Sequence, residues 1–169
     1  LSVGYYFGGR LADKHPSEKY FYLIILCGGL SVALLYLLML FVLPYIGYAL
    51  PATTGPAISS VLLFFLPASL LGLLSPFAIK LHQQSLRGKG TGQASGEIFF
   101  WSTLGSIFGS FFAGFVLIPW LGTKQIVFTV ALVLILLGLI PLLKIGFLRK
   151  YVLGVTILAI ALPPAEQSA

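Results

Sequence analysis

Residues 20–43 read YFYLIILCGGLSVALLYLLMLFVL, without one charged side chain. A helix needs about 20 apolar residues to cross the hydrocarbon core of a bilayer, so this stretch is long enough to span a membrane. Three further charge-free stretches of similar length follow at 57–79, 98–117 and 125–143. These stretches are apolar all round instead of alternating in polarity, which disfavours transmembrane strands. We therefore predict an all-α, polytopic transmembrane helix bundle.

The composition of the 169-residue chain excludes a soluble globular domain. Charged residues make up 8% of the chain, against roughly 25% in an ordinary soluble domain, and the mean hydropathy is +1.05. The ten basic residues lie between apolar blocks, so the net charge of +6 is typical of membrane loops and predicts no nucleic-acid partner. The lipid bilayer is the expected partner. The single cysteine, Cys27, cannot form an intrachain disulfide.

The two ends of the chain indicate a fragment of a longer membrane protein. Residues 1–9 are apolar and begin without an initiator methionine, so we interpret them as the tail of an earlier helix, truncated at its N-terminal side. Residues 151–162 form an apolar segment that is short for a span. It crosses only if 147–150 joins it and its basic side chains reach back to the interface.

The basic residues alternate between the connections. The Lys and Arg counts are 3, 0, 3, 1 and 3, which together make the ten of the chain, in the connections 10–19, 44–56, 80–97, 119–124 and 144–150. Cytoplasmic loops of membrane proteins carry an excess of Lys and Arg. We therefore predict that the first, third and fifth connections are cytoplasmic and that the other two face outside.

The first connection contains a recognisable motif, GGRLADK at residues 8–14. It resembles the cytoplasmic loop signature of the major facilitator superfamily, in which Gly9, Arg10 and Asp13 are candidates for a gating role. Glycine permits a tight turn, and Asp13 can cap the next helix or pair with a basic side chain across the bundle. The alternative is an ordinary interfacial turn with solvated charges.

The stretch 98–117 carries two rows of small residues at intervals of four. Such rows let helix backbones approach closely in lipid, so we predict a helix–helix contact along this helix. The alternative is that the serines line a polar pathway. The rows are Ser102, Ser106, Ser110 and Gly114 in one, and Gly105, Gly109 and Ala113 in the other.

Two further features of the spans have alternative interpretations. Glu97 precedes the stretch 98–117, where the helix dipole favours a carboxylate; the alternative is an intramembrane polar site for a proton or cation, with Ser102 and Ser106. Pro67 and Pro76 interrupt the stretch 57–79 and predict kinks. Broken helices are common in transporter sites and also in membrane helices without that role.

Chemistry is not expected from this chain. It has four acidic residues in all, and no carboxylate pair is placed for acid–base work. His15 and His82 lie in the predicted basic loops and are expected to be solvated side chains and not metal ligands. We predict no catalytic residue, no metal and no cofactor in these 169 residues.

Three stretches together resemble one family. Residues 4–13 read GYYFGGRLAD, residues 71–80 read LGLLSPFAIK, and 96–122 contain the small-residue rows. Their order and spacing look like the membrane domain of spermidine-synthase-like proteins, the fused major-facilitator/spermidine synthases. The resemblance implies a major-facilitator-like half-bundle of helices, located in a bacterial-type plasma (inner) membrane.

In that family the membrane domain precedes a cytosolic Rossmann-like aminopropyltransferase domain that uses decarboxylated S-adenosylmethionine and a polyamine. That catalytic domain is absent here, so the resemblance implies a membrane domain that anchors or serves it, with the remaining helices and a C-terminal domain as partners. A cytosolic enzyme domain conflicts with the charge count if 151–162 crosses the membrane. The alternative function is a fragment of a major-facilitator-type transporter.

The charge count makes a testable prediction about Ser85, which lies in the third connection. A Ser85→Cys variant should resist an impermeant thiol reagent added outside intact cells, because the connection 80–97 is predicted to be cytoplasmic. The measurement is the labelled fraction before and after the cells are opened. Efficient labelling of intact cells would invert the topology.

Overall fold

The computed structural model describes residues 1–41, 53–86 and 90–145, and every regular element in these ranges is helical. The all-α prediction is therefore confirmed. The short segment predicted at 151–162 lies outside the described residues. In chain order the elements are α1 (Ser2–Lys14), α2 (Glu18–Phe41), α4 (Gly55–Gly72), α5 (Leu74–Ser85), α6 (Thr91–Phe112), the π-helical turn η1 (Ala113–Leu117), α7 (Ile118–Trp120) and α8 (Thr123–Lys144).

Four helical stretches are long and apolar enough to cross a membrane, as an integral membrane protein requires. They are Glu18–Phe41, Gly55–Ser85, Thr91–Trp120 and Thr123–Lys144. Each contains or overlaps one predicted span, but the second and third extend well into the predicted connection 80–97. A charged side chain ends an apolar run without ending a helix. The predicted spans, which were bounded by charged residues, are therefore shorter than the helices.

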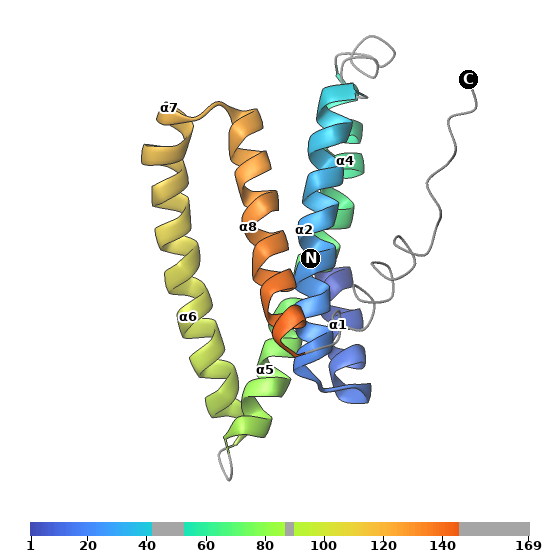
Figure 1. Ribbon diagram of the computed structural model, residues 1–169, viewed down its shortest axis with the longest axis vertical. Coiled ribbons are helices and arrows are strands. Elements are labelled where there is room, and N and C mark those ends of the chain that lie inside the picture. The colour runs from blue at the N-terminus through green and yellow to red at the C-terminus, as the bar shows by residue number, and fades with distance from the viewer. Residues whose placement is uncertain (42–52, 87–89, 146–169) are drawn as a thin grey trace, which may run out of the picture.

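The helices form a bundle with α2 at its centre (Figure 1). The most extensive contact between two described helices joins α2 to α8, and α2 also packs against α4. The short helix α1 packs on α4 and α5. α6 stands at the side of the bundle; it contacts α5 at one end and leads through η1 and α7 to α8 at the other.

The described residues next to the connections that are rich in Lys and Arg lie at one end of the bundle. Figure 1 places the α1–α2 turn, the end of α5, the start of α6 and the end of α8 at its lower end. The end of α2, the start of α4 and α7 lie at the opposite end. This arrangement agrees with the alternation of basic residues along the chain. Which end is cytoplasmic stays a prediction.

Proline explains the two irregularities in the long spans. The ring of Pro76 would collide with the carbonyl four residues earlier, on Gly72, and α4 ends at that residue before α5 begins at Leu74. Near Pro119 the helix instead widens, because the Ile118 N–H donates to the carbonyl of Ala113 five residues back. A wider turn makes room for a proline ring. α4 runs helically through Pro67, so the helix is interrupted near Pro76 and not at Pro67, and a kink at Pro67 stays a prediction.

Glycines mediate the close approach of helices, but at positions that differ from the predicted ones. A Cβ built on Gly138 of α8 would lie 2.6 Å from the backbone nitrogen of Leu26 on α2, and one on Gly29 of α2 would lie 2.7 Å from that of Ile135 on α8. On α1, a Cβ at Gly8 would lie 2.7 Å from the carbonyl oxygen of Leu73. The α2–α8 and α1–α4/α5 contacts therefore depend on the absence of a side chain.

The small-residue rows of α6 have no such neighbour in the part of the chain that the structure describes. No atom of another element lies within 4 Å of a Cβ built on Gly105, Gly109 or Gly114, and Ala113 is half-buried. A helix–helix contact along these rows, whether with a second molecule or another segment, stays a prediction.

Matched substitutions at Gly138 and Gly109 compare a glycine that faces a neighbouring helix with one that has no described neighbour. Gly138→Leu should lower the free energy of unfolding by about 3 kcal/mol, the upper end of the range for overpacking, because the new side chain meets the backbone of α2. If the described neighbours are the only ones, Gly109→Leu should leave it nearly unchanged, because they leave that side of α6 open. Thermal unfolding in a nonionic detergent measures both. Equal destabilisation by Gly109→Leu would reveal a partner on the α6 rows.

Candidate functional site

The candidate site is the polar end of the bundle, organised by three consecutive residues of α5. Lys80, Leu81 and His82 are successive helical residues, so their side chains point about 100° apart. Leu81 packs against the buried cluster of Ala12, Ile24 and Phe77, which joins α1, α2 and α5. With Leu81 facing the core, Lys80 and His82 extend to either side of it toward different helices.

Lys80 extends toward α1. Its Nζ lies 2.8 Å from Oδ1 of Asp13, and the side chains are 35% and 69% exposed, respectively. Asp13 lies within α1 and therefore does not cap the next helix; it makes the other interaction predicted for it, a pair across the bundle. At this exposure an ion pair contributes only about 0.2–1 kcal/mol. It fixes the orientation of α1 more than it stabilises the fold.

The other two residues of the loop signature make no contact with a second helix that the structure records. The Arg10 guanidinium lies 4.4 Å from the ring centroid of Tyr6, one turn earlier on α1, which is a cation–π arrangement. No atom of another element lies within 4 Å of a Cβ built on Gly9. Among the contacts that the structure describes, Asp13 is the one candidate of the three that connects two helices. A gating role for the signature stays untested.

His82 extends the other way, toward α6. Its Nε2 lies 2.6 Å from Oε2 of Glu97, with the two side chains 32% and 39% exposed. Gln93, one turn earlier on α6, donates from Nε2 to the other carboxylate oxygen of Glu97 at 3.1 Å. Both oxygens of Glu97 are thus engaged, one by its own helix and one by α5.

This contact corrects two expectations from the sequence. Glu97 does not begin a helix, because α6 starts at Thr91. The dipole effect fades beyond the first turn, so it does not explain the position of Glu97. His82 was expected to be solvated and is instead paired. The signal that could have found the pair is the short turn between α5 and α6, because residues at similar distances from a turn face each other in a helical hairpin.

The two serines of the predicted intramembrane polar site are exposed, and the structure records no hydrogen bond from them to His82, Gln93 or Glu97. Ser106 donates its hydroxyl to the carbonyl of Ser102 on its own helix, at 2.9 Å. A serine at membrane depth commonly satisfies its hydroxyl in this way. A polar pathway along Ser102 and Ser106 stays a prediction.

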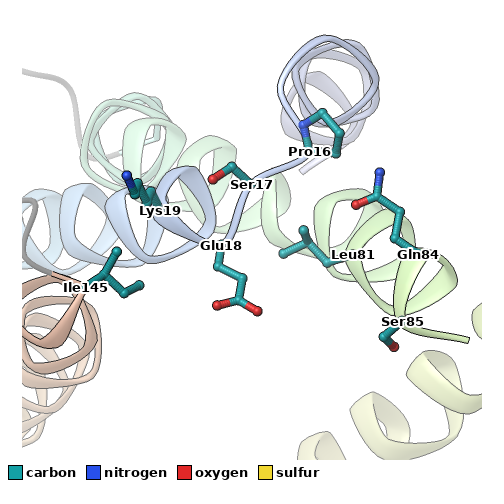
Figure 2. A pocket seen from close by; sticks show the side chains of 8 residues that line it. All are labelled: Pro16, Ser17, Glu18, Lys19, Leu81, Gln84, Ser85 and Ile145. Carbon is teal, nitrogen blue, oxygen red and sulfur yellow. The ribbon is translucent and has the colours of Figure 1, made fainter.

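A cavity of about 490 Å³ opens at the same end of the bundle (Figure 2). In Figure 2 the carboxylate of Glu18 projects into the space between α5 and α8, while Lys19 points away from it. The hydroxyl of Ser85 donates to the carbonyl of His82 at 2.8 Å. The eight lining residues are Pro16, Ser17, Glu18, Lys19, Leu81, Gln84, Ser85 and Ile145.

The chemistry available at this end is hydrogen bonding and charge pairing. Within residues 1–41, 53–86 and 90–145, no three His, Cys, Asp or Glu side chains gather closely enough to hold a metal ion. The carboxylates of Asp13 and Glu97 are already engaged by Lys80 and His82. Through these two pairs, α5 is joined to α1 and to α6.

No family model, no curated protein and no solved structure matches the chain. Its function is therefore inferred from its residues and their contacts.

A double-mutant cycle tests the Asp13–Lys80 pair. Asp13→Asn, Lys80→Met and the double variant should give a coupling energy of about 0.2–1 kcal/mol. Thermal unfolding in nonionic detergent provides the free energies. The coupling should largely vanish at 1 M salt, where the Debye length is about 3 Å. A coupling that 1 M salt leaves intact would contradict an exposed, screened pair.

Proposed function

We propose that this chain is the integral membrane domain of a spermidine-synthase-like membrane protein. In this proposal the chain forms a major-facilitator-like bundle that anchors or serves a polyamine aminopropyltransferase domain outside these 169 residues. A bacterial-type plasma membrane is the proposed location. The four apolar helices long enough to cross a bilayer support the membrane role.

One observation carries the proposal: the separate stretches on which the resemblance rests meet in space. Asp13 ends the first stretch and pairs with Lys80, the last residue of the second. A Cβ built on Gly8 would lie within 3 Å of atoms of Leu73 and Pro76, again joining the first stretch to the second. The residues that carry the resemblance therefore also supply contacts between helices, which supports the proposal.

The third stretch is connected to the second by the next polar contact along α5. Glu97, the second residue of that stretch, bonds to His82, two residues after Lys80. The motif residues thus act as parts of one junction at the basic end of the bundle. A domain attached at this end would be held by helices that are themselves tied together.

The acidic residues of the chain support placing aminopropyl transfer in the proposed separate domain and not in these 169 residues. The reaction needs a base that takes a proton from an amine, and a polycation needs several free carboxylates. Asp13 and Glu97 are engaged on different helices, and Glu18 lies at the start of a third. The fourth, Glu166, lies outside the described residues.

The second candidate function is a fragment of a major-facilitator-type transporter. The signature-like loop with Asp13 paired to Lys80, together with the helix break before Pro76, favours it, since broken helices recur at transporter sites. The gene that encodes the chain separates the two candidates. A downstream Rossmann-type glycine loop followed by acidic residues supports the first candidate, whereas a further set of apolar helices supports the second.

The first candidate predicts that the chain expressed alone shows no aminopropyl transfer. Binding of spermidine or putrescine should be weak and salt-sensitive, because isolated exposed charges are screened within about 8 Å at physiological salt. Isothermal titration of the purified chain in detergent measures the affinity at low and high salt. Micromolar, salt-resistant binding would mean that a buried site exists, with Glu97 the first residue to substitute.

A further inference from the structure

The main contacts of α6 with the rest of the described chain lie at its two ends. Ala94, in its first turn, is its one buried residue, and residues 101–112 are exposed throughout. α8, the next long helix, packs along α2, and α5 is the one separate helix in substantial contact with α6. Figure 1 shows α6 standing beside the bundle as an arm.

The upper end of this arm is a joint. Leu121 and Gly122 both have extended backbones, with φ −121°, ψ 136° and φ −66°, ψ 155°, so two non-helical residues separate α7 from α8. A few such residues are sufficient to absorb a change in helix direction. The exposed Trp120, at 84%, adds no packing that would brace the joint.

The lower end is held by the polar contact between α5 and α6. Glu97 lies one turn after the buried Ala94 and bonds to His82 at 2.6 Å, while Gln93 orients its second oxygen at 3.1 Å. In lipid no hydrophobic force draws one apolar helix to another, so close packing and polar bonds determine association. Because the glycine rows of α6 have no described neighbour, the polar contact carries more of that task here than between α2 and α8.

We propose that the His82–Glu97 contact is a latch and that α6 is the movable element of this bundle. When the latch is closed, α6 rests against α5. When it is open, α6 swings about the Leu121–Gly122 joint while α1, α2, α4, α5 and α8 keep their positions. This inference stands on the contacts of α6 and is independent of the proposed function.

The geometry gives the motion a measurable size. Phe100 lies 21 residues from Leu121, which is about 32 Å of helix at 1.5 Å per residue, so a swing of about 15° would displace it by about 8 Å. Phe100 is 59% exposed and accepts a spin label. The single cysteine, Cys27, is exposed on α2 and provides the second label position.

In a Phe100→Cys protein, one spin label is attached at position 100 and the other at Cys27. Pulsed electron paramagnetic resonance then measures the distance between the two labels, with the full chain in lipid nanodiscs. This doubly labelled protein is the background into which the other substitutions are introduced. The background protein should give one narrow distribution. His82→Ala and Glu97→Ala should each broaden it and shift it by several ångströms. Gln93→Ala should have a smaller effect in the same direction, because Gln93 only orients the carboxylate.

Lys80→Ala provides the matched control. It removes the other polar contact of α5, two residues before His82, but that contact leads to α1 and not to α6. Its distance distribution should equal that of the background. The swapped pair His82→Glu with Glu97→His should recover the narrow distribution, which a variant that merely disturbs folding would not do.

Two results would overturn the latch. One is a narrow, unshifted distribution in both His82→Ala and Glu97→Ala, which would mean that α6 is held by something else. The other is equal broadening by Lys80→Ala, which would mean that the whole end of the bundle loosens. If His82→Ala fails to fold, the same decision rests on Gln93→Ala and the swapped pair. Broadening in Gln93→Ala and a narrow distribution in the swapped pair support the latch, and the opposite results overturn it.

Discussion

The constraint on which this structure depends is that a backbone in lipid must satisfy its own hydrogen bonds. Water is absent from the bilayer core, so each unpaired N–H or C=O would cost several kcal/mol. Long helices meet that requirement, and irregularities are tolerated only where the chain closes most of its bonds locally. The π turn before Pro119 fits this rule, since Ile118 bonds to Ala113 one residue further back than usual. The break between α4 and α5 is equally short, because the Leu73 N–H bonds to the carbonyl of Leu70.

A second constraint follows from the first: once the helices are formed, lipid offers no hydrophobic reward for bringing them together. The bundle uses two other means. Along α2 and α8, glycines remove side chains where the backbones approach, as at Gly29 and Gly138. At the polar end, Lys80 and His82 of one helix reach two neighbours. The first means gives a broad contact and the second gives two local ones, and this difference is the basis for our proposal that α6 moves while α2 and α8 stay together.

The sequence predicted the coarse architecture because length and apolarity alone determine a membrane span. It predicted the boundaries less well, since Lys80 and Glu97 end apolar runs but lie inside helices. The candidate site was only partly accessible. Asp13 was expected to pair across the bundle, but no pattern named Lys80 as its partner. Which glycines meet a neighbour was also not predictable, because Gly109 and Gly138 both lie in apolar helices and differ only in what packs beside them.

The α2–α8 contact also has a consequence for how the protein assembles. Some 80 residues separate the end of α2 at Phe41 from the start of α8 at Thr123. At a synthesis rate of about 5–20 residues per second, α2 waits roughly 4–16 s in the membrane before its main partner emerges from the ribosome. During that interval the surface around Gly29, which faces Ile135 of α8 in the finished bundle, is open to lipid and to any other helix with a small-residue face. The central α2–α8 contact can form only after α8 is inserted. The last long helix of the described chain therefore completes the main contact of a helix that was inserted much earlier.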